Sequence, residues 1–165
     1  MAANVAKTRI LFVCLGNICR SPTAEVVFRS AAARAGLAHR VEIDSAGTGE
    51  WHIGNPPDYR AIAHAARRGY DLTSLRARQV TVADFERFHW ILAMDHSNLD
   101  DLRELRPPGC SGHLRLFLEA AGSPTHEVPD PYDGGPEGFE RMLDLIESAS
   151  TAFAGRLVLS LADNR

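Results

Sequence analysis

The segment Cys14–Ser21 constrains the fold of this chain more than any other, because it separates two patterns of different kind. Before it lies a continuous apolar run, Ile10–Val13, which is typical of a strand buried on both faces. After it, Pro22 begins a segment with helical spacing. A loop between a strand and a helix N-terminus directs backbone N–H groups at one point and therefore binds anions. With Cys14 at its start and Arg20 at its end, this loop can enclose a phosphate-sized oxyanion above a nucleophile.

Strands and helices alternate through the rest of the chain. The first helix is expected to end at Gly36. Apolar runs predict further strands at 40–44, 89–94 and 114–118. Helical spacing predicts helices at 58–68, 81–88, 95–105 and 137–153. Such alternation indicates a parallel sheet covered on both faces. We therefore expect an α/β fold with three layers, α/β/α, around a central four-stranded parallel sheet, with a phosphate-binding loop after the first strand.

Length and composition favour a globular protein of ordinary size. The 165 residues suit one domain, 1–165, in which residues 1–7 form a flexible tail. The net charge of −3 argues against a nucleic-acid partner. No run of about 18 apolar residues occurs and the N-terminus lacks the apolar core of a signal peptide, so we expect neither a membrane span nor export. The odd number of cysteines, three, suits a reducing compartment, and we expect a cytoplasmic protein.

Cys14 is the candidate nucleophile of the loop. A thiol reacts as the thiolate, and a helix N-terminus together with a nearby arginine favours that form. Both features are available to Cys14. Cys110, by contrast, has the pattern of a small buried hydrophobic residue.

Other loop residues suit the binding of an oxyanion. The planar guanidinium of Arg20 can contact two phosphate oxygens at once. Ser21 is predicted to cap the first helix and also to donate its hydroxyl to the sulfur of Cys14. Gly16 and Asn17 are residue types that tolerate the left-handed backbone of a tight anion-binding loop. The loop thus combines a nucleophile with the groups that would hold its target.

A zinc site is the main alternative for Cys14 and Cys19. Two further ligands would be needed, and neither Cys110 nor the seven histidines form a pair at zinc spacing. We therefore expect no metal.

A proton donor for a leaving group is found far along the chain. Asp130 lies in a segment stiffened by prolines, Val128–Tyr132. A carboxyl group there can protonate an ester oxygen as it leaves phosphorus. An Asp-Pro pair is also an ordinary turn, and spacing alone does not decide between the two interpretations.

Cys14-x5-Arg20-Ser21 near the N-terminus, with Asp130-Pro131-Tyr132 near the C-terminus, resembles the low-molecular-weight protein tyrosine phosphatase family. The similarity extends from Arg9 over nearly the whole chain. Further landmarks in family order are found at 44–47, 51, 77–79 and 93–95.

The resemblance implies a reaction on phosphotyrosine in two steps. Cys14 attacks phosphorus while Asp130 protonates the phenolate, and Asp130 then activates the water that releases inorganic phosphate from the phosphocysteine. Arg20 and the loop hold the phosphate throughout. The implied substrate-binding residues are Leu15, Gly16, Asn17, Ile18, Cys19, Ser21, Trp51 and Tyr132, of which Leu15, Ile18, Trp51 and Tyr132 wall the cleft.

The resemblance also implies partners and a response to oxidants. No cofactor or metal is needed. The expected partners are a phosphotyrosine protein as substrate and a tyrosine kinase, and the protein is expected to be a monomer or a weak homodimer. Cys19 would form a disulfide with Cys14 under oxidant and protect the nucleophile from further oxidation.

Two positions depart from the pattern of many relatives. Asp133 stands where they have a second tyrosine, and its charge near the cleft disfavours strongly acidic substrates. Leu75 stands where some relatives have a histidine behind the phosphate-binding loop. Asn17 would then be secured by Ser21, by Ser45 or by water.

Three alternative functions share features of this sequence. An arsenate reductase of the same fold needs a further pair of cysteines, which Cys110 alone does not supply. A protein arginine phosphatase carries a smaller threonine at the position of Ile18, so this residue favours tyrosine. A phosphopeptide-binding module without catalysis would need neither Cys14 nor Asp130.

Overall fold

The four predicted strands form one parallel sheet. The computed structural model describes residues 6–163, so most of the predicted tail 1–7 lies outside the described residues. The strands are β1 (Thr8–Cys14), β2 (Val41–Gly47), β3 (Trp90–Ala93) and β4 (His113–Leu116). They are arranged in the order β2-β1-β3-β4, and all three neighbouring pairs are parallel. The predicted α/β fold is confirmed.

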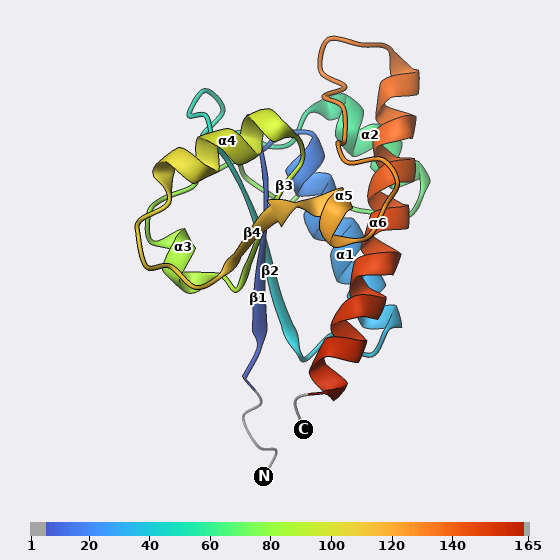
Figure 1. Cartoon of the computed structure of the whole chain (residues 1–165). Helices are drawn as coiled ribbons and strands as arrows, with labels where there is room; N and C mark the ends of the chain where they lie inside the picture. Colours follow the sequence, from blue (N-terminus) through green and yellow to red (C-terminus); the bar gives the residue numbers. More distant parts are fainter. Residues whose placement is uncertain (1–5, 164–165) are drawn as a thin grey trace.

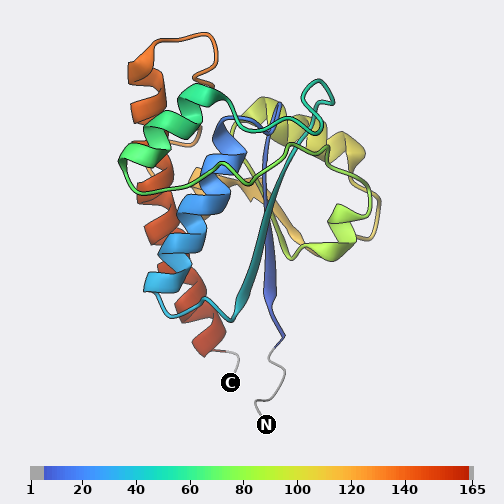
Figure 2. The ribbon, with the colours of Figure 1, turned by 180° about the vertical axis from the view of Figure 1, so that it is seen from behind.

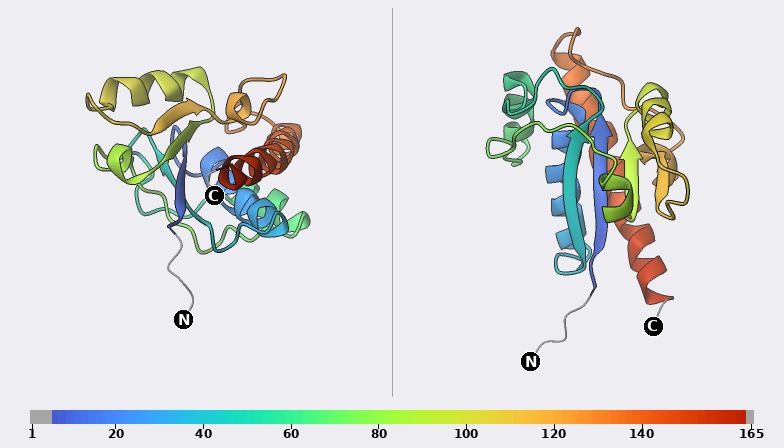
Figure 3. Two further views of the ribbon diagram at one scale, coloured as in Figure 1. Left: turned by 60° about the horizontal axis from the view of Figure 1, so that its bottom comes forward. Right: turned by 90° about the vertical axis from the view of Figure 1, so that its left-hand side faces the viewer.

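Helices cover both faces of this sheet. The helices are α1 (Arg20–Arg34), α2 (Tyr59–Arg67), α3 (Asp84–Arg87), α4 (His96–Leu105), α5 (Phe117–Ala120) and α6 (Pro136–Ala162). Figures 1 and 3 show α1 and α6 on one face of the sheet and α3 and α4 on the other. Seen from behind in Figure 2, α2 lies beside α1 and α6. The structure thus has the three expected layers.

The burial of β1 on both of its faces explains why its sequence is apolar without alternation. Ile10 and Phe12 belong to the core that α1 and α6 complete, whereas Leu11 and Val13 belong to the core on the side of α3 and α4. All four side chains are fully buried. Since both faces of β1 are covered, every position along it must be apolar.

Several predicted boundaries were wrong. The strand predicted at 40–44 continues to Gly47, and the helix predicted at 81–88 spans only Asp84–Arg87. The fourth strand, predicted at 114–118, ends at Leu116, and Phe117 begins the short helix α5. A short apolar run fits a buried strand and a buried helix equally well, which is why the pattern missed this change. The last helix, predicted at 137–153, continues to Ala162, and Leu157 on the added turns is buried.

Helix α6 is by length and composition apolar enough to cross a membrane. In the structure, however, its side chains at 139, 143, 146 and 153 are buried in the core shared with α1. A core helix of a globular domain passes the same test of length and composition.

The sheet order places a crevice beside the end of β1. The chain leaves β1 for β2 on one side and later adds β3 on the other, so the order reverses at β1, and ligands of such sheets bind where it reverses. Here the backbones of two loops meet closely, because the N–H of Thr48 donates to the carbonyl of Cys14 (2.9 Å) and that of Gly49 to Leu15 (2.8 Å). A side chain at Gly47 would place its Cβ 2.7 Å from the carbonyl oxygen of Leu15, so only glycine fits.

Candidate active site

The loop that follows β1 ends at an uncapped helix N-terminus. Helix α1 begins at Arg20, and within the described chain no side chain caps its first turn. Ser21 does not cap the helix, so that prediction was wrong, but its buried hydroxyl lies 3.0 Å from the sulfur of Cys14, as was also predicted. The first N–H groups of α1 are therefore left to bind an anion beside the thiol.

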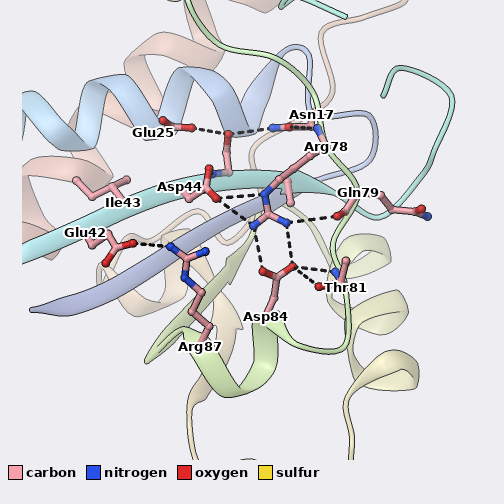
Figure 4. Close-up of polar contacts among 12 residues, drawn as sticks. Asn17, Glu25, Glu42, Ile43, Asp44, Arg78, Gln79, Thr81, Asp84 and Arg87 are labelled. Atoms are coloured by element: carbon pink, nitrogen blue, oxygen red, sulfur yellow. Dashed lines mark hydrogen bonds and ion pairs between the residues drawn. The ribbon is translucent and has the colours of Figure 1, made fainter. Parts of the chain in front are cut away.

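Asn17 fixes the shape of this loop from behind. It has left-handed backbone geometry, with φ of 56°. Its amide nitrogen donates to the hydroxyls of Ser21 (2.8 Å) and Ser45 (3.0 Å), as was expected with leucine at position 75. Its amide oxygen accepts from the backbone N–H of Arg78 (3.0 Å), and Ser45 in turn donates to Glu25 (2.7 Å). Figure 4 shows the part of these polar contacts that lies between Glu25, Asn17 and Arg78.

Arg20 is held rigidly at the end of the loop. Its side chain is buried, and Nη1 donates to Asp95 Oδ2 (2.6 Å) and to the carbonyl of Val128 (3.0 Å). Nη2 lies 3.6 Å from Asp130 Oδ2. Asp95 follows β3 and caps α4 by accepting from the N–H of Asn98. Arg20 therefore brings together the loop after β1, the start of α4 and the segment of Asp130.

One cleft of about 210 Å³ lies over these groups. It is lined by Cys14, Leu15, Gly16, Ile18, Cys19, Arg20, Trp51, His52, Asp130, Tyr132 and Asp133. All predicted site residues except Asn17 and Ser21 thus line it, and these two lie directly behind the loop. His52, which sequence reasoning missed, approaches Gly16 closely enough that a Cβ there would lie 3.0 Å from its ring.

The cleft has exposed aromatic walls. Trp51 is 70% exposed and Tyr132 45% exposed, so neither is a packed anchor of its loop. The indole of Trp51 lies against Gly49, where any side chain would collide with it. A larger hollow of about 500 Å³, near Cys110 and His113, contains none of the groups described above. In residues 6–163, no three His, Cys, Asp or Glu side chains gather as metal ligands would.

The start of helix α2 contacts both the phosphate-binding loop and the segment that carries Tyr132. The backbone N–H of Asp58 donates to the carbonyl of Ile18 (2.8 Å), and the Asp58 carboxylate forms an ion pair with Arg60 (3.0 Å). The Arg60 guanidinium lies 5.4 Å from the ring centre of Tyr132 and 4.9 Å from that of Phe139. Cation–π contacts of this kind stabilise the position of the Tyr132 segment relative to the loop.

Cys19, the second cysteine of the loop, is less reactive than an exposed cysteine. Cys19 is buried, and burial raises its pKa well above the ordinary value, with the negative charge of Asp58 adding to the effect. At neutral pH Cys19 is therefore a neutral thiol beside the nucleophile.

The model of the low molecular weight phosphotyrosine protein phosphatase family matches residues 9–162. The chain belongs to this family. A phosphatase of the family from Schizosaccharomyces pombe is 47% identical over 133 residues, which cover 79% of this chain and 85% of that protein. The crystal structure of a protein tyrosine phosphatase from Entamoeba histolytica superimposes with a TM-score of 0.86 at 36% identity, covering 96% of this chain and 99% of that one.

The same fold also occurs with another stated activity. A crystal structure described as drosophila arginine phosphatase superimposes with a TM-score of 0.83 at 29% identity, covering 90% of this chain and 96% of that chain. Neither the family nor the fold therefore decides which phosphorylated residue is the substrate. That choice depends on the residues that line the cleft.

Proposed function

We propose that this protein hydrolyses phosphotyrosine in proteins through a phosphocysteine intermediate and releases inorganic phosphate. The observation that carries the proposal is the meeting of Cys14, Arg20 and Asp130 in one cleft with aromatic walls. These three residues supply a nucleophile, a cation for the phosphate oxygens and a proton donor. Membership of the phosphatase family supports the same conclusion.

In the first step Cys14 attacks phosphorus and the bond to the phenolic oxygen breaks. The loop N–H groups and Arg20 surround the three equatorial oxygens, where charge is spread in the transition state. Asp130, 44% exposed at the cleft, gives its proton to the departing phenolate. The N–H of Tyr132 donates to Asp130 Oδ1 (3.1 Å) and so orients the carboxyl group.

In the second step a water molecule replaces the thiol on phosphorus. Asp130, now ionised, accepts a proton from this water as the P–S bond breaks. The hydroxyl of Ser21, 3.0 Å from the sulfur, stabilises Cys14 as a thiolate leaving group. Phosphate then leaves, and the protein returns to its starting state.

The lining of the cleft favours phosphotyrosine over its competitors. Leu15, Trp51 and Tyr132 offer apolar surface to a phenyl ring, whereas phosphoserine is too short to carry its phosphate past such walls to the thiol. Ile18 lines the cleft at the position where a protein arginine phosphatase is expected to carry a smaller threonine, which argues against phosphoarginine. Asp133 also lines the cleft and repels strongly acidic sequences near the phosphotyrosine.

Hydrolysis of three peptides that differ only in the phosphorylated residue tests this proposal. With a chelator present, we expect the phosphotyrosine peptide to release phosphate at least about 100-fold faster than the phosphoserine peptide, since the walls contact only the ring. The phosphoarginine peptide is expected to be slower than phosphotyrosine. Faster release from phosphoarginine, or a requirement for added metal, would contradict the proposal.

The proposal extends to the cellular setting. A phosphotyrosine phosphatase acts on the products of a tyrosine kinase, and the cytoplasm is where we place this one. All three cysteines are free thiols, which suits a reducing compartment. We propose a monomer or weak homodimer as the acting form.

Reversible inactivation by peroxide is part of the proposal. Peroxide converts the Cys14 thiolate to a sulfenic acid, and the Cys19 thiol then displaces hydroxide from it, giving a disulfide and water. Both thiols line the same cleft, and the high pKa of Cys19 makes it the second reactant rather than the first.

We expect Cys19→Ser to lower the recovery of activity after peroxide far more than it changes the initial activity. After mild peroxide, dithiothreitol should restore most wild-type activity, whereas the variant should recover less than about half because its sulfenic acid is oxidised further. Cys110→Ser, outside the cleft, is the matched control and should recover like wild type. Equal recovery of the Cys19 variant and wild type would exclude the protective disulfide.

A further inference from the structure

The segment Ala77–Val80 supports the cleft although it contributes no side chain to its lining. The N–H of Arg78 donates to the amide oxygen of Asn17 (3.0 Å), behind the phosphate-binding loop. The carbonyl of Arg78 accepts from the N–H of Gly47 (2.8 Å), and the N–H of Val80 donates back to Gly47 (2.8 Å). The segment therefore connects the loop to the end of β2.

The same segment also holds the loop that carries the aromatic wall. The N–H of Gly54 donates to the carbonyl of Ala77, and the N–H of Ala77 donates to the carbonyl of Asn55, both at 2.8 Å. Trp51 lies on this loop. Displacement of Ala77–Val80 would thus reach both the phosphate-binding loop and the wall of the cleft.

The main-chain pairing of this segment with β2 is short. Its contact with β2 is an isolated bridge between Gly47 and Gln79 and not a full strand pairing. A short extended segment with so few ladder bonds opens readily. Side-chain contacts therefore add to the main-chain bonds that set its position.

The side chain of Arg78 provides these contacts. As Figure 4 shows, its guanidinium lies between the carboxylates of Asp44 and Asp84. Nε donates to Asp44 (3.1 Å), and the two terminal nitrogens donate to both oxygens of Asp84 (3.0 and 3.1 Å). Asp84 is buried and also accepts from the N–H of Thr81 (2.8 Å). This paired geometry fixes Arg78 between β2 and α3.

We propose that Arg78 is a positioning residue for phosphate binding. Its ion pairs with Asp44 and Asp84 place its own backbone N–H opposite the amide oxygen of Asn17, and this contact helps keep Asn17 in the left-handed conformation that the loop needs. Without it, a buried amide oxygen loses its partner and a strained backbone loses support. The inference rests on the proposed function only in taking phosphate as the ligand of the loop.

A second arginine on the same side of the sheet provides a matched control. Arg87 forms an ion pair with Glu42 on β2 (2.6 Å), and Figure 4 shows it beside the Arg78 cluster. Both side chains of this pair are exposed, and the pair is separate from the contacts of Asn17. Arg87→Met thus removes the same charge and an ion pair to β2, an exposed one, without touching the contacts of Asn17.

The test compares Arg78→Met, Arg78→Lys and Arg87→Met in the full chain. Calorimetry gives the Kd of inorganic phosphate, kinetics give kcat and KM for p-nitrophenyl phosphate, and urea unfolding shows that each variant is folded under assay conditions. We expect Arg78→Met to raise the Kd about tenfold and to lower kcat/KM by about 10- to 100-fold, because the loop is misplaced. Arg87→Met should stay within about twofold of wild type. Arg78→Lys, which can pair with only part of the cluster, should fall between.

A double-mutant cycle separates positioning from a general loss of stability. Asn17→Gly removes the acceptor of the Arg78 N–H while tolerating the positive φ. In that background, Arg78→Met should change the phosphate Kd by less than about twofold, because the contact between the Arg78 N–H and the side chain at position 17 is already absent. If the double variant raised the phosphate Kd by the product of the two single-variant factors, the inference would be overturned.

Asp84→Asn breaks the cluster from its other end and keeps the test informative if Arg78→Met does not fold. It should raise the phosphate Kd as Arg78→Met does, and wild-type affinity in this variant would also overturn the inference. If the wild-type protein bound phosphate but did not hydrolyse phosphotyrosine, the proposed function would fail while the affinity series still tested Arg78.

Discussion

Replacement of Cys14 by serine is expected to lower the turnover of p-nitrophenyl phosphate by roughly 10⁴-fold or more. A serine hydroxyl is not ionised at neutral pH, and Ser21, its neighbour in the loop, is a hydroxyl that cannot act as a base. The loop N–H groups and Arg20 remain in place, so inorganic phosphate should still bind. Steady-state kinetics and calorimetry with phosphate measure the two effects separately.

Loss of turnover with retained phosphate binding would identify Cys14 as the nucleophile and not merely as part of the loop. Cys110→Ser is the matched control, since Cys110 lies outside the cleft, and it should keep wild-type turnover. Full activity in the Cys14 variant would contradict the mechanism.

The sequence was most informative where the contacts are local. β1, the loop and the start of α1 are continuous in the chain, so one stretch carries the strand pattern, the thiol and the helix start together. Even there, the expected role of Ser21 as a helix cap was wrong. Cap preference assumes that the hydroxyl has no better partner, but the fold offers it Cys14 and Asn17 in a buried position.

Sequence reasoning anticipated some contacts between distant segments, such as that of Asn17 with Ser45, but missed two others. Asp95 meets Arg20 only because β3 pairs beside β1, and Arg78 meets Asn17 only because its segment lies against β2. Both residues lie in segments that resemble family landmarks, 77–79 and 93–95, but such a pattern does not say which distant residue each one contacts. A weak signal existed for Asp95, because it follows a predicted buried strand, and the carboxyl ends of parallel strands meet at the ligand-binding edge.

Replacement of Asp130 by alanine is expected to have the second largest effect, and its size should depend on the leaving group. For phenyl phosphate, whose phenolate leaves poorly, kcat/KM should fall by about 10² to 10⁴. For p-nitrophenyl phosphate, whose leaving group needs little protonation, the fall should be much smaller. A series of substituted phenyl phosphates measures this dependence. Asp133→Asn, a change to another carboxylate that lines the same cleft, should alter all members of the series equally.

The two roles assigned to Asp130 can be separated in the same experiment. Because kcat/KM reports the step that forms the phosphocysteine, its dependence on the leaving group should become steeper without the acid. Every aryl ester forms the same phosphocysteine, so loss of the base in the second step should lower the limiting kcat of all good leaving groups by one common factor. A variant with a steeper dependence but wild-type kcat for good leaving groups would show that Asp130 acts only as the acid. Another group of the cleft would then have to activate the water, and His52, which lines the cleft and has no assigned role, is a candidate.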